Sequence, residues 1–486
     1  MPAFADRSLR NPGKHGIVTG VRNLVRENLR FFVWATLAGL ALRLTFFFLL
    51  PRVTDDSHLY ADIARNWLQH GIYGITDSNQ IVATFSRLPG YPAFLAAIFA
   101  VFGIGNYNAV LLIQIAIDLA TCFLIGDLAR RTISDRSAKA AFLLSALCPF
   151  LANYASAALT ETLEIFFTAL ALNLAVAALD SKMERNRYWA GCGFAIAACI
   201  LLRPDGGLLL AAVGVYLGIR VLGGIRASVP PQAFVRAGLL VAFCALAPLS
   251  PWGWRNWHTL HQVQFLAPRY ANQQDEFVPM GFNRWVRTWI ADYVSTEEIY
   301  WNVPGESVDP GKLPDRAFDS AEQRAQTVAA FDAYNKENQI TPTIDAQFDG
   351  LAARRIRAHP FRYYVQLPLL KIIDMWMRPR TELLPPDSRW YEFNDDLRWQ
   401  VLAISLGLIN LGYVLAACAG LLLRCRQIAW VGLPLVFVVL RSLFLGSLEN
   451  PESRYTLECY PAIIWFAASL WTLGSQRVLQ SGQDST

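Results

Sequence analysis

Charge is scarce in this 486-residue chain. Asp, Glu, Lys and Arg together make up 17% of the residues, whereas hydrophobic residues make up 54%. Soluble globular domains carry about 25% charged residues, and the mean hydropathy here is +0.29. The formal net charge of +5 reflects basic segments beside hydrophobic runs and an Arg-rich polar segment, so it does not indicate nucleic-acid binding. The composition excludes an ordinary soluble enzyme and predicts an integral membrane protein.

Several familiar motifs are absent. The sequence has no P-loop, no GxSxG motif, no Cys/His zinc cluster, no CxxC pair and no internal repeat. These absences argue against P-loop nucleotide binding, a serine-hydrolase elbow and structural zinc. The eight cysteines avoid the longest polar segment, so we expect buried core residues rather than a disulfide framework. Seven of them lie in or beside apolar runs: Cys122, Cys148, Cys192, Cys199, Cys244, Cys418 and Cys425.

About ten apolar runs are long enough to cross a membrane as helices. A helix of roughly 16 to 25 apolar residues crosses a hydrocarbon core of about 30 Å, and only intrahelical hydrogen bonds satisfy the backbone there. The sequence therefore predicts an all-α polytopic membrane protein. The predicted spans are 31–50, 107–129, 138–153, 158–179, 188–203, 205–222, 235–252, 399–423, 428–447 and 456–474.

Basic residues between these spans set the orientation. Five basic groups share one side of the membrane only if the apolar stretch 91–104 does not cross, so we predict an interfacial helix there. Both termini are then cytoplasmic. The segment 203–206 (RPDG) is expected to form a tight outer turn between two spans. The groups are Arg7/Arg10/Lys14/Arg22/Arg26/Arg30, Arg130/Arg131/Arg136/Lys139, Lys182/Arg185/Arg187, Arg220/Arg226/Arg236 and Arg424/Arg426.

Two polar segments, 51–106 and 253–398, then emerge on the extracytoplasmic face. The second has about 145 residues, too many for a simple connection, and predicts a small domain. Its tryptophans fit an interfacial belt or sugar-stacking platforms, and the belt accounts better for most of them. Together with Trp252 just before the segment, these are Trp254, Trp257, Trp285, Trp289, Trp301, Trp376 and Trp390. The predicted domains are 1–30 (cytoplasmic basic tail), 31–252 (N-terminal transmembrane module), 253–398 (large loop), 399–475 (C-terminal transmembrane helices) and 476–486 (cytoplasmic tail).

The first polar segment is predicted to carry an interfacial amphipathic helix over 55–70. Apolar residues recur there at helical spacing, and Gly71 follows as a stop signal. The helix begins with Asp55 and Asp56, two adjacent carboxylates favoured by the helix dipole. They are either capping charges or functional acids, and the pattern leaves both open. Arg87 follows in the turn sequence RLPGYP, so acidic and basic groups meet at the membrane surface.

Further ionisable residues are predicted at the same face. Glu161 falls near the outer end of the fourth span, where an ionisable group is costly and indicates function. Arg87, Arg255 and Arg454 are expected to converge on a phosphate at headgroup depth. Glu452 accompanies Arg454 on the last loop. The competing interpretation is that these arginines extend toward lipid headgroups.

A metal site is only weakly indicated. His258 and His261 share one helical face, but two ligands without a visible third favour histidines that bind no metal. Asp55, Asp56 and His58 form a second combination that could hold a divalent ion.

The order of the motifs resembles the GT-C glycosyltransferases related to protein O-mannosyltransferases and lipid A aminoarabinose transferases. No single motif is specific, but the resemblance covers nearly the whole chain in order. One departure is that the family usually has Glu where Asp56 stands, which leaves open which carboxylate is the base. The matching runs are DDxxxYxxIA at 55–64, RxPGYP at 87–92, LTE at 159–161, PWxxRN at 251–256, HP at 359–360 and ExRY at 452–455.

This resemblance implies the GT-C fold and a function. The chain is expected to transfer a single sugar from a polyprenyl, undecaprenyl-like monophosphate donor to an acceptor hydroxyl at the periplasmic face of the inner membrane. The acceptor would be a lipid such as lipid A, a glycan or a protein of the cell envelope, and no cofactor or divalent metal is expected to be required. One displacement inverts the anomeric configuration. The implied residues are catalytic Asp55, Asp56 and Glu161, donor-phosphate ligands Arg87, Arg255 and Arg454, and substrate-binding Tyr60, Tyr91, Glu452 and Tyr455.

Two other functions remain open from the sequence. An oligosaccharide ligase or oligosaccharyltransferase would also act at the outer face, but on pyrophosphate-linked glycans. A transporter or flippase would place ionisable residues near the middle of the bilayer and show internal repeats. The charges here gather at one face, and no repeat occurs, which disfavours transport.

Overall fold

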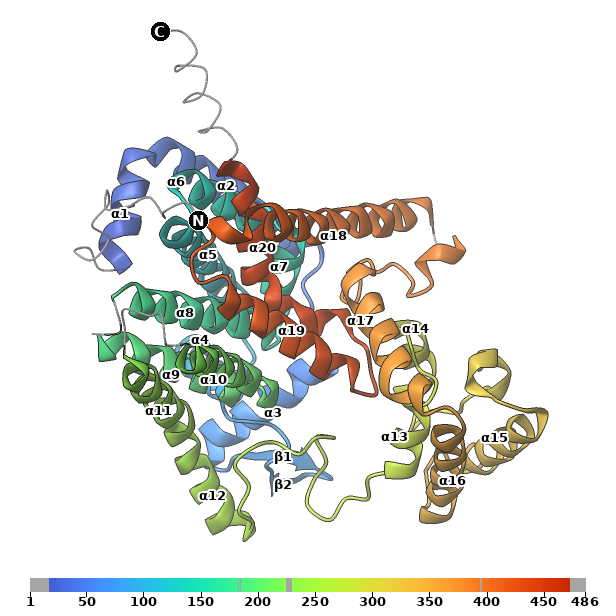
Figure 1. Cartoon of the computed structure of the whole chain (residues 1–486). Coiled ribbons are helices and arrows are strands. Elements are labelled where there is room, and N and C mark those ends of the chain that lie inside the picture. The colour runs from blue at the N-terminus through green and yellow to red at the C-terminus, as the bar shows by residue number, and fades with distance from the viewer. Residues whose placement is uncertain (1–16, 182, 184, 224–229, 394–395, 473–486) are drawn as a thin grey trace. The chain divides into compact units, whose positions relative to one another are not determined.

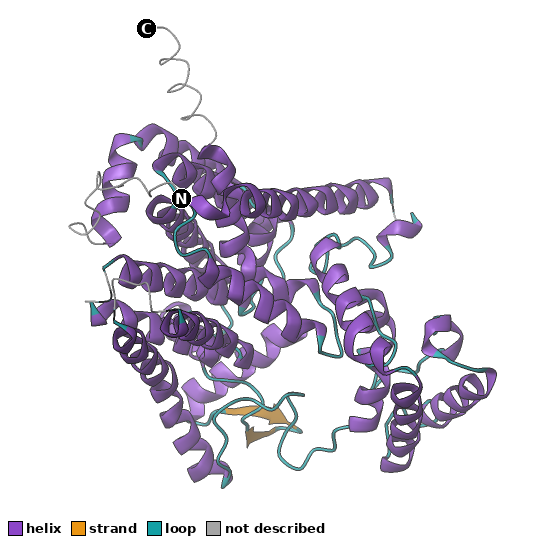
Figure 2. Ribbon diagram, in the orientation of Figure 1, coloured by secondary structure: helices purple, strands orange, loops and turns teal. Residues whose placement is uncertain are grey.

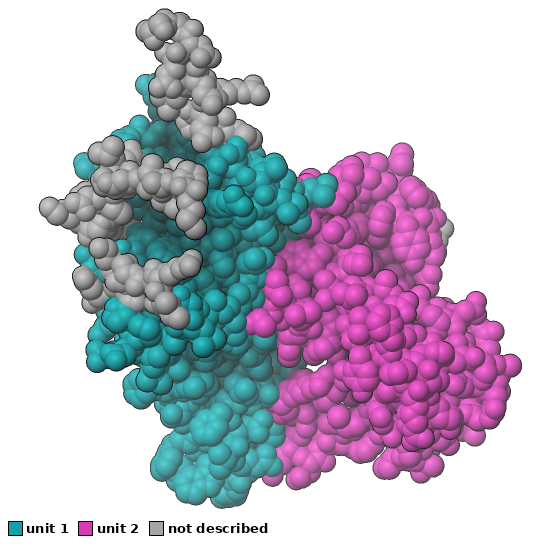
Figure 3. All heavy atoms as spheres, viewed as in Figure 1, with its two compact units in different colours: residues 1–267, 415–437, 458–486 teal, residues 268–414, 438–457 magenta. Residues whose placement is uncertain are grey.

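The structure is a computed structural model that describes residues 17–181, 183, 185–223, 230–393 and 396–472. Helices joined by loops and turns dominate these residues, and the named strands form one short hairpin (Figure 2). The chain divides into two compact units (Figure 3). Unit 1 comprises Met1–Ala267, Leu415–Phe437 and Glu458–Thr486, and unit 2 comprises Pro268–Val414 and Val438–Leu457. The basic residues Arg7, Arg10, Lys14, Lys182 and Arg226 and the tail 476–486 lie outside the described residues.

Unit 1 contains the N-terminal helices and the hairpin (Figure 1). Its elements are α1 (Ile17–Glu27), α2 (Leu29–Leu49), α3 (Asp55–His70), β1 (Gly74–Asp77), β2 (Gln80–Ala83), α4 (Gly90–Phe102), α5 (Tyr107–Thr132), α6 (Asp135–Ala146), α7 (Pro149–Ala155), α8 (Glu161–Asp180), α9 (Asn186–Leu202), η2 (Pro204–Gly206), α10 (Gly207–Leu222), α11 (Pro231–Leu246), η4 (Ala247–Leu249), α12 (Ser250–Leu260), η10 (Cys425–Gln427), α20 (Tyr460–Ala468) and η12 (Ser469–Thr472). Three elements contribute residues to both units, namely α18 (Leu397–Arg424), α19 (Gly432–Gly446) and η11 (Ser453–Cys459).

Among the described residues, six helical stretches are long and apolar enough to span a membrane. They are Leu29–Leu49, Tyr107–Thr132, Glu161–Asp180, Pro204–Leu222, Pro231–Leu260 and Leu397–Gln427. The pair α6 and α7, bent by 52°, makes a seventh if it is counted as one span. Each of these overlaps a predicted span, and the remaining three predicted spans contain shorter helices of 17, 15 and 9 residues, α9, α19 and α20. The prediction of an all-α integral membrane protein is confirmed.

The first polar segment is attached to the rest of unit 1 at several points. Arg52, just after α2, forms a parallel bridge with Ala157, and its backbone N–H donates to Ser156 O at 3.0 Å. The hairpin is joined to α3 because Asp62 accepts hydrogen bonds from Thr76 N at 2.6 Å and from Thr76 Oγ1 at 3.0 Å. These bonds hold α3 and the hairpin together as one piece of unit 1.

Arg43 on α2 and Asp118 on α5 form an ion pair within the membrane-spanning helices. Arg43 Nε donates to Asp118 Oδ2 at 2.6 Å, and the two side chains are 0% and 2% exposed. Arg43 Nη1 also donates to the carbonyls of Gly39 at 2.8 Å and of Ala146 at 2.6 Å. A buried charge is tolerated when it is paired and hydrogen-bonded. Both conditions hold here, and the pair links α2, α5 and α6. The expectation that the ionisable residues gather at one face is therefore wrong for Arg43 and Asp118.

Replacing Arg43 by Ala should destabilise the protein by about 3–5 kcal/mol, because it leaves the Asp118 carboxylate buried without its partner. The double variant Arg43→Ala/Asp118→Ala removes both charges and should be more stable than the single variant. Thermal unfolding of all three proteins in the same detergent, followed by tryptophan fluorescence, measures both differences. A single variant with the Tm of the wild-type protein would contradict the role given to this pair.

Unit 2 contains short helices and turns followed by the first half of α18. Its complete elements are α13 (Met280–Val286), α14 (Tyr293–Ser295), η5 (Thr296–Tyr300), η6 (Pro310–Lys312), η7 (Asp315–Ala317), α15 (Ala321–Tyr334), α16 (Pro342–Ala358), η8 (Arg362–Gln366), α17 (Leu367–Met377) and η9 (Trp390–Glu392). The turns η5 and η8 are π-helical. The small domain predicted for 253–398 stays a prediction, and most of that segment lies in unit 2, whose bounds differ from it.

An aromatic core holds unit 2 together. Trp285 and Trp289 are completely buried, with ring centroids 5.3 Å apart, and Phe331 and Phe348 pack against them. The predicted interfacial belt is therefore wrong for these two tryptophans, which lie in and just after α13. Burial of a large aromatic ring stabilises a small domain strongly. By contrast, Trp254 remains 62% exposed.

Candidate active site

The N-terminus of α3 presents Asp55 and Asp56 in its first turn. Capping is performed by other residues, because Thr54 accepts from Ser57 N, and Ser57 Oγ accepts from Thr54 N at 3.0 Å. The two carboxylates are therefore not needed as caps, although the helix dipole still favours them there. Asp55 is exposed and, within the part of the chain that the structure describes, makes no hydrogen bond or ion pair.

Asp56 is held by the predicted phosphate ligand Arg87. Arg87 Nη2 donates to Asp56 Oδ1 at 3.0 Å, and both side chains are partly exposed, at 21% and 35%. The guanidinium carbon of Arg87 lies 5.9 Å from the ring centroid of Tyr60, one turn further along α3. The sequence placed acidic and basic groups together in this segment, and the structure shows which carboxylate Arg87 contacts.

The rings of Tyr60 and Tyr91 pack against each other next to the Asp56–Arg87 pair. Their ring centroids are 5.1 Å apart in an edge-to-face arrangement, and Tyr91 is completely buried. The Tyr91 hydroxyl donates to Gln114 Oε1 at 2.7 Å, and Gln114 Nε2 donates to Ala157 O at 2.7 Å. Tyr91 therefore supports the Tyr60 ring from the protein interior.

Glu161, at the first residue of α8, lies beside an arginine that the sequence analysis did not select. Arg203 Nη1 is 3.5 Å from Glu161 Oε1, and Arg203 Nε is 3.7 Å from Glu164 Oε1 and 3.4 Å from Asp205 Oδ1. The Arg203 side chain is 20% exposed, whereas those of Glu161 and Glu164 are 2% exposed. One partly accessible guanidinium is thus fixed in place by surrounding carboxylates.

Both groups act electrostatically on the Tyr60 hydroxyl. Burial raises the pKa of Tyr60 above its usual range, Arg87 and Arg203 oppose that rise, and Asp56 and Glu161 add to it. All four charges therefore act on one hydroxyl group within unit 1. We call Asp56, Tyr60, Arg87, Glu161 and Arg203, together with Asp55 because it precedes Asp56 in the first turn of α3, the α3 cluster.

Arg203 was missed because 203–206 was interpreted as a tight turn and no more. The turn itself is present, as η2. The sequence did contain a signal for a functional role of Arg203. Under the predicted orientation Arg203 is a cation at the outer end of a span, where positively charged residues are disfavoured. Two of its carboxylate partners, Glu161 and Glu164, lie on α8 and could not be assigned from spacing along the chain.

Arg255 contacts backbone rather than the α3 cluster. Its guanidinium donates to Thr84 O at 2.7 Å and Tyr73 O at 2.5 Å, and it lies 5.2 Å from the Tyr73 ring centroid and 5.3 Å from that of Trp252. Tyr73 in turn donates to Arg87 O at 3.0 Å. Arg255 is thus connected to the backbone of Arg87 through the segment that follows α3.

Glu452, Arg454 and Tyr455 belong to unit 2. Arg454 Nε donates to Glu452 Oε2, and Arg454 Nη2 donates to the Tyr455 hydroxyl at 3.2 Å. The loop that carries them is held by buried Arg380, whose Nη1 donates to Ser453 O at 2.7 Å. The three residues predicted together from the last loop do contact one another.

His258 and His261 do not belong to a metal-binding group among the described residues. His258 stacks at 4.2 Å on Trp254, and His261 ends α12 in the left-handed region with φ 54°. No group of three His, Cys, Asp or Glu side chains among the described residues has an arrangement suited to a metal ion.

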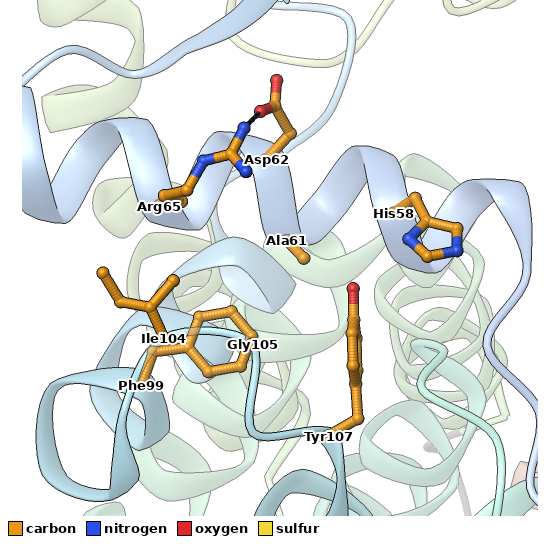
Figure 4. Close-up of a pocket in the computed structure, with 8 residues that line it drawn as sticks. All are labelled: His58, Ala61, Asp62, Arg65, Phe99, Ile104, Gly105 and Tyr107. Carbon is orange, nitrogen blue, oxygen red and sulfur yellow. Dashed lines mark hydrogen bonds and ion pairs between the residues drawn. The ribbon is translucent and has the colours of Figure 1, made fainter.

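The opposite face of α3 borders a cavity of about 380 Å³. Figure 4 shows His58 and Arg65 of α3 on one side of it and Phe99, Ile104 and Tyr107 on the other. His58 faces Tyr107, with ring centroids 6.2 Å apart. Among the described residues, His58, Asp55 and Asp56 do not form a group arranged to hold a metal ion.

Comparison with known families identifies part of the chain. Residues 86–252 match the dolichyl-phosphate-mannose-protein mannosyltransferase family. This segment includes Arg87, Glu161 and Arg203 but is less than half of the chain. A comparison with curated proteins found no match.

Solved structures of glycosyltransferases are similar to the whole chain. An Archaeoglobus fulgidus oligosaccharyltransferase tethered to an acceptor peptide is 13% identical, with a TM-score of 0.50 over 94% of this chain and 51% of that one. AglB from the same organism, in complex with an inhibitory peptide and a dolichol-phosphate, is 12% identical, with a TM-score of 0.49 over 94% and 52%. ArnT from Cupriavidus metallidurans bound to undecaprenyl phosphate is 14% identical, with a TM-score of 0.35 over 95% and 81%.

These similarities concern the fold. The chain spans about half the length of the archaeal oligosaccharyltransferase chains it matches. At 13% identity and a TM-score of 0.50, the likeness shows the arrangement of the backbone alone. The predicted GT-C fold is confirmed.

Proposed function

We propose that this chain is an integral membrane glycosyltransferase that transfers a single sugar from a polyprenyl monophosphate donor to an acceptor hydroxyl. The observation that carries the proposal is the α3 cluster, in which Asp55 directly precedes the Arg87-paired Asp56 in the first turn of α3. A carboxylate base next to cations is what displacement of a phosphate leaving group requires. The family matched by 86–252 is named for dolichyl-phosphate-mannose, which supports the donor class.

Asp55 is proposed as the general base. It is exposed and has no partner among the described residues, so its carboxylate can accept the proton of the acceptor hydroxyl. The acceptor oxygen then bonds to the anomeric carbon as the bond from that carbon to the phosphate oxygen breaks. The bonding electrons leave with the phosphate, which is a stable anion and needs no proton. This single displacement, through an oxocarbenium-like state, inverts the configuration.

Arg87 and Arg203 are proposed to stabilise the charge that grows on the leaving phosphate. Asp56 orients Arg87, which it contacts at 3.0 Å, and Glu161 orients Arg203 from 3.5 Å. Arg203 replaces Arg255 in this role because Arg255 donates to backbone carbonyls. Arg255 is a positioning residue that holds the segment leading to Arg87.

The remaining predicted residues take supporting roles. Tyr60 faces the charges of the α3 cluster and is proposed to contact the substrate, with buried Tyr91 behind it. Glu452, Arg454 and Tyr455 remain proposed substrate and phosphate contacts on the last loop of unit 2. We propose that the reaction occurs on the extracytoplasmic face, with both termini cytoplasmic, from the distribution of basic residues between spans.

The strongest competing function is transfer of a pyrophosphate-linked glycan, because the fold matches an archaeal oligosaccharyltransferase. The full-length protein in proteoliposomes should be given either a radiolabelled polyprenyl-monophosphate sugar or a pyrophosphate-linked oligosaccharide, with envelope lipids and proteins as acceptors. We expect label transfer from the monophosphate donor only. Transfer from the pyrophosphate donor alone would establish the competing function, and transfer from neither would contradict both. A no-enzyme reaction supplies the background.

A further inference from the structure

Gln114 of α5 connects the segments that carry the charged residues of the α3 cluster. Its side chain is completely buried and makes two hydrogen bonds, one through each end of the amide. Oε1 accepts from the Tyr91 hydroxyl at 2.7 Å, and Nε2 donates to Ala157 O at 2.7 Å. Tyr91 and Ala157 are buried as well, so water does not compete for either bond. The proposed reaction leaves Gln114 without a role.

The bond to Ala157 reaches the connection between α7 and α8. Ala157 O also accepts from Leu159 N at 2.8 Å, so this carbonyl belongs to the turn that precedes α8. Glu161, the first residue of α8, lies four residues after Ala157. Gln114 therefore fixes the turn that places Glu161 in the α3 cluster.

The same turn is bonded to the segment that precedes α3. Arg52 N donates to Ser156 O at 3.0 Å, and Ala158 N donates to Arg52 O at 3.1 Å, which forms a parallel bridge. Asp55, the first residue of α3, follows Arg52 by three residues. The start of α3 is thereby held against the turn that precedes α8.

The bond to Tyr91 reaches the start of α4. Tyr91 is the second residue of this helix and follows Arg87 by four residues. The preceding residue, Gly90, packs against the end of α9, because a Cβ atom there would lie 2.6 Å from Leu201 O. Arg203 follows Leu201 by two residues. The start of α4 therefore adjoins the segments that carry both arginines of the α3 cluster.

We propose that Gln114 is a positioning residue for sugar transfer, which sets the position of Asp55 relative to the two arginines of the α3 cluster. This inference rests on the proposed function. The base and the cations that stabilise the leaving phosphate act on opposite sides of the anomeric carbon, and a displacement of about 1 Å can lower the rate by about 100-fold. A primary amide suits this role because it offers both a donor and an acceptor without carrying a charge.

Hydrogen exchange tests the positioning without any transfer reaction. Gln114→Leu removes both hydrogen bonds and keeps a side chain of similar size. Exchange is measured by mass spectrometry on the full-length protein in detergent, for peptides that contain 52–56 and 156–161. We expect amides in both peptides to exchange about tenfold faster than in the wild-type protein, because the parallel bridge opens more often when Gln114 no longer holds Ala157.

Asn173→Leu is the matched control. Asn173 is completely buried on α8 and, like Gln114, uses its amide to join two elements, because Nδ2 donates to Leu124 O of α5 at 2.7 Å. Its loss should lower the Tm to a similar extent, as expected when a buried hydrogen bond is removed. Exchange of 52–56 and 156–161 should stay as in the wild-type protein. The comparison separates a local effect at the α3 cluster from a general loosening of the helices.

Initial rates at saturating donor measure the consequence for catalysis. Gln114→Leu should lower kcat about 10- to 100-fold and change the donor KM by less than about threefold, because the reacting groups are misaligned while the donor still binds. Asn173→Leu should keep both constants near wild type. A purely structural role of Gln114 would affect the two variants alike.

Unchanged exchange in Gln114→Leu, or an equal increase in Asn173→Leu, overturns the proposal. So does a wild-type kcat in Gln114→Leu when the wild-type protein transfers sugar. A wild-type protein that transfers no sugar contradicts the proposed function instead, and the exchange result then decides by itself whether Gln114 positions these segments.

Discussion

Replacing Asp55 by Asn should lower kcat for sugar transfer by about 10²–10⁴-fold, the usual contribution of a general base. The amide cannot accept the proton of the acceptor hydroxyl. Asp55 is exposed and makes no hydrogen bond or ion pair among the described residues, so its replacement should leave the fold and the donor KM close to wild type. Initial rates at saturating donor, together with the Tm of the variant, measure both expectations.

The neighbouring variant Asp56→Asn provides the control. It removes the partner that Arg87 contacts at 3.0 Å, so the main effect should be a higher donor KM, with a smaller loss of kcat than in Asp55→Asn. The reverse pattern, with transfer lost only in Asp56→Asn, would make Asp56 the base. Near-normal transfer by both variants would rule out a base at the N-terminus of α3.

Replacing Arg203 by Gln should lower kcat/KM for the donor by about 10²–10³-fold, as expected when one group that stabilises developing charge is removed. Arg203 is the partly exposed cation that pairs with Glu161, Glu164 and Asp205, so its loss removes the guanidinium of this group. Rates measured at low donor concentration report this ratio directly. Asp205→Asn is the matched control and should retain most activity, because it keeps the cation.

The same substitution leaves buried carboxylates beside a neutral side chain, so its effect on folding must be separated from its effect on catalysis. Arg203→Lys serves this purpose, because it retains the charge but loses the planar fork of donors. We expect a Tm near wild type and an intermediate kcat/KM. A folded Arg203→Gln protein with wild-type kcat/KM would remove Arg203 from the phosphate site.

The positions of the long helices were predictable because the bilayer imposes a length on apolar runs. The break between α6 and α7 was not predicted, although the sequence shows its cause. The run 138–153 was treated as one span, whereas Pro149 begins a new helix after Cys148. Proline lacks a backbone N–H and clashes with the preceding turn, so it favours the first turn of a helix over its interior.

The candidate site was only partly predictable for a different reason. Arg87 could be placed in the same polar segment as Asp55 and Asp56 from the sequence, but its contact with Asp56 could not. The contact between Arg203 and Glu161 joins the end of α9 to the start of α8, and such pairing depends on tertiary packing. The prediction that Trp285 and Trp289 belong to an interfacial belt was wrong for a similar reason. A tryptophan at the membrane interface and one in a protein core cannot be told apart in the sequence.

The buried pair between Arg43 and Asp118 has a consequence for biosynthesis. A helix carrying an uncompensated Arg partitions poorly into lipid, and the same holds for one carrying Asp. Because α2 is made before α5, Arg43 lacks its partner until α5 has left the ribosome. Integration of these two helices is therefore coupled, and α2 is expected to remain near the insertion machinery until α5 arrives.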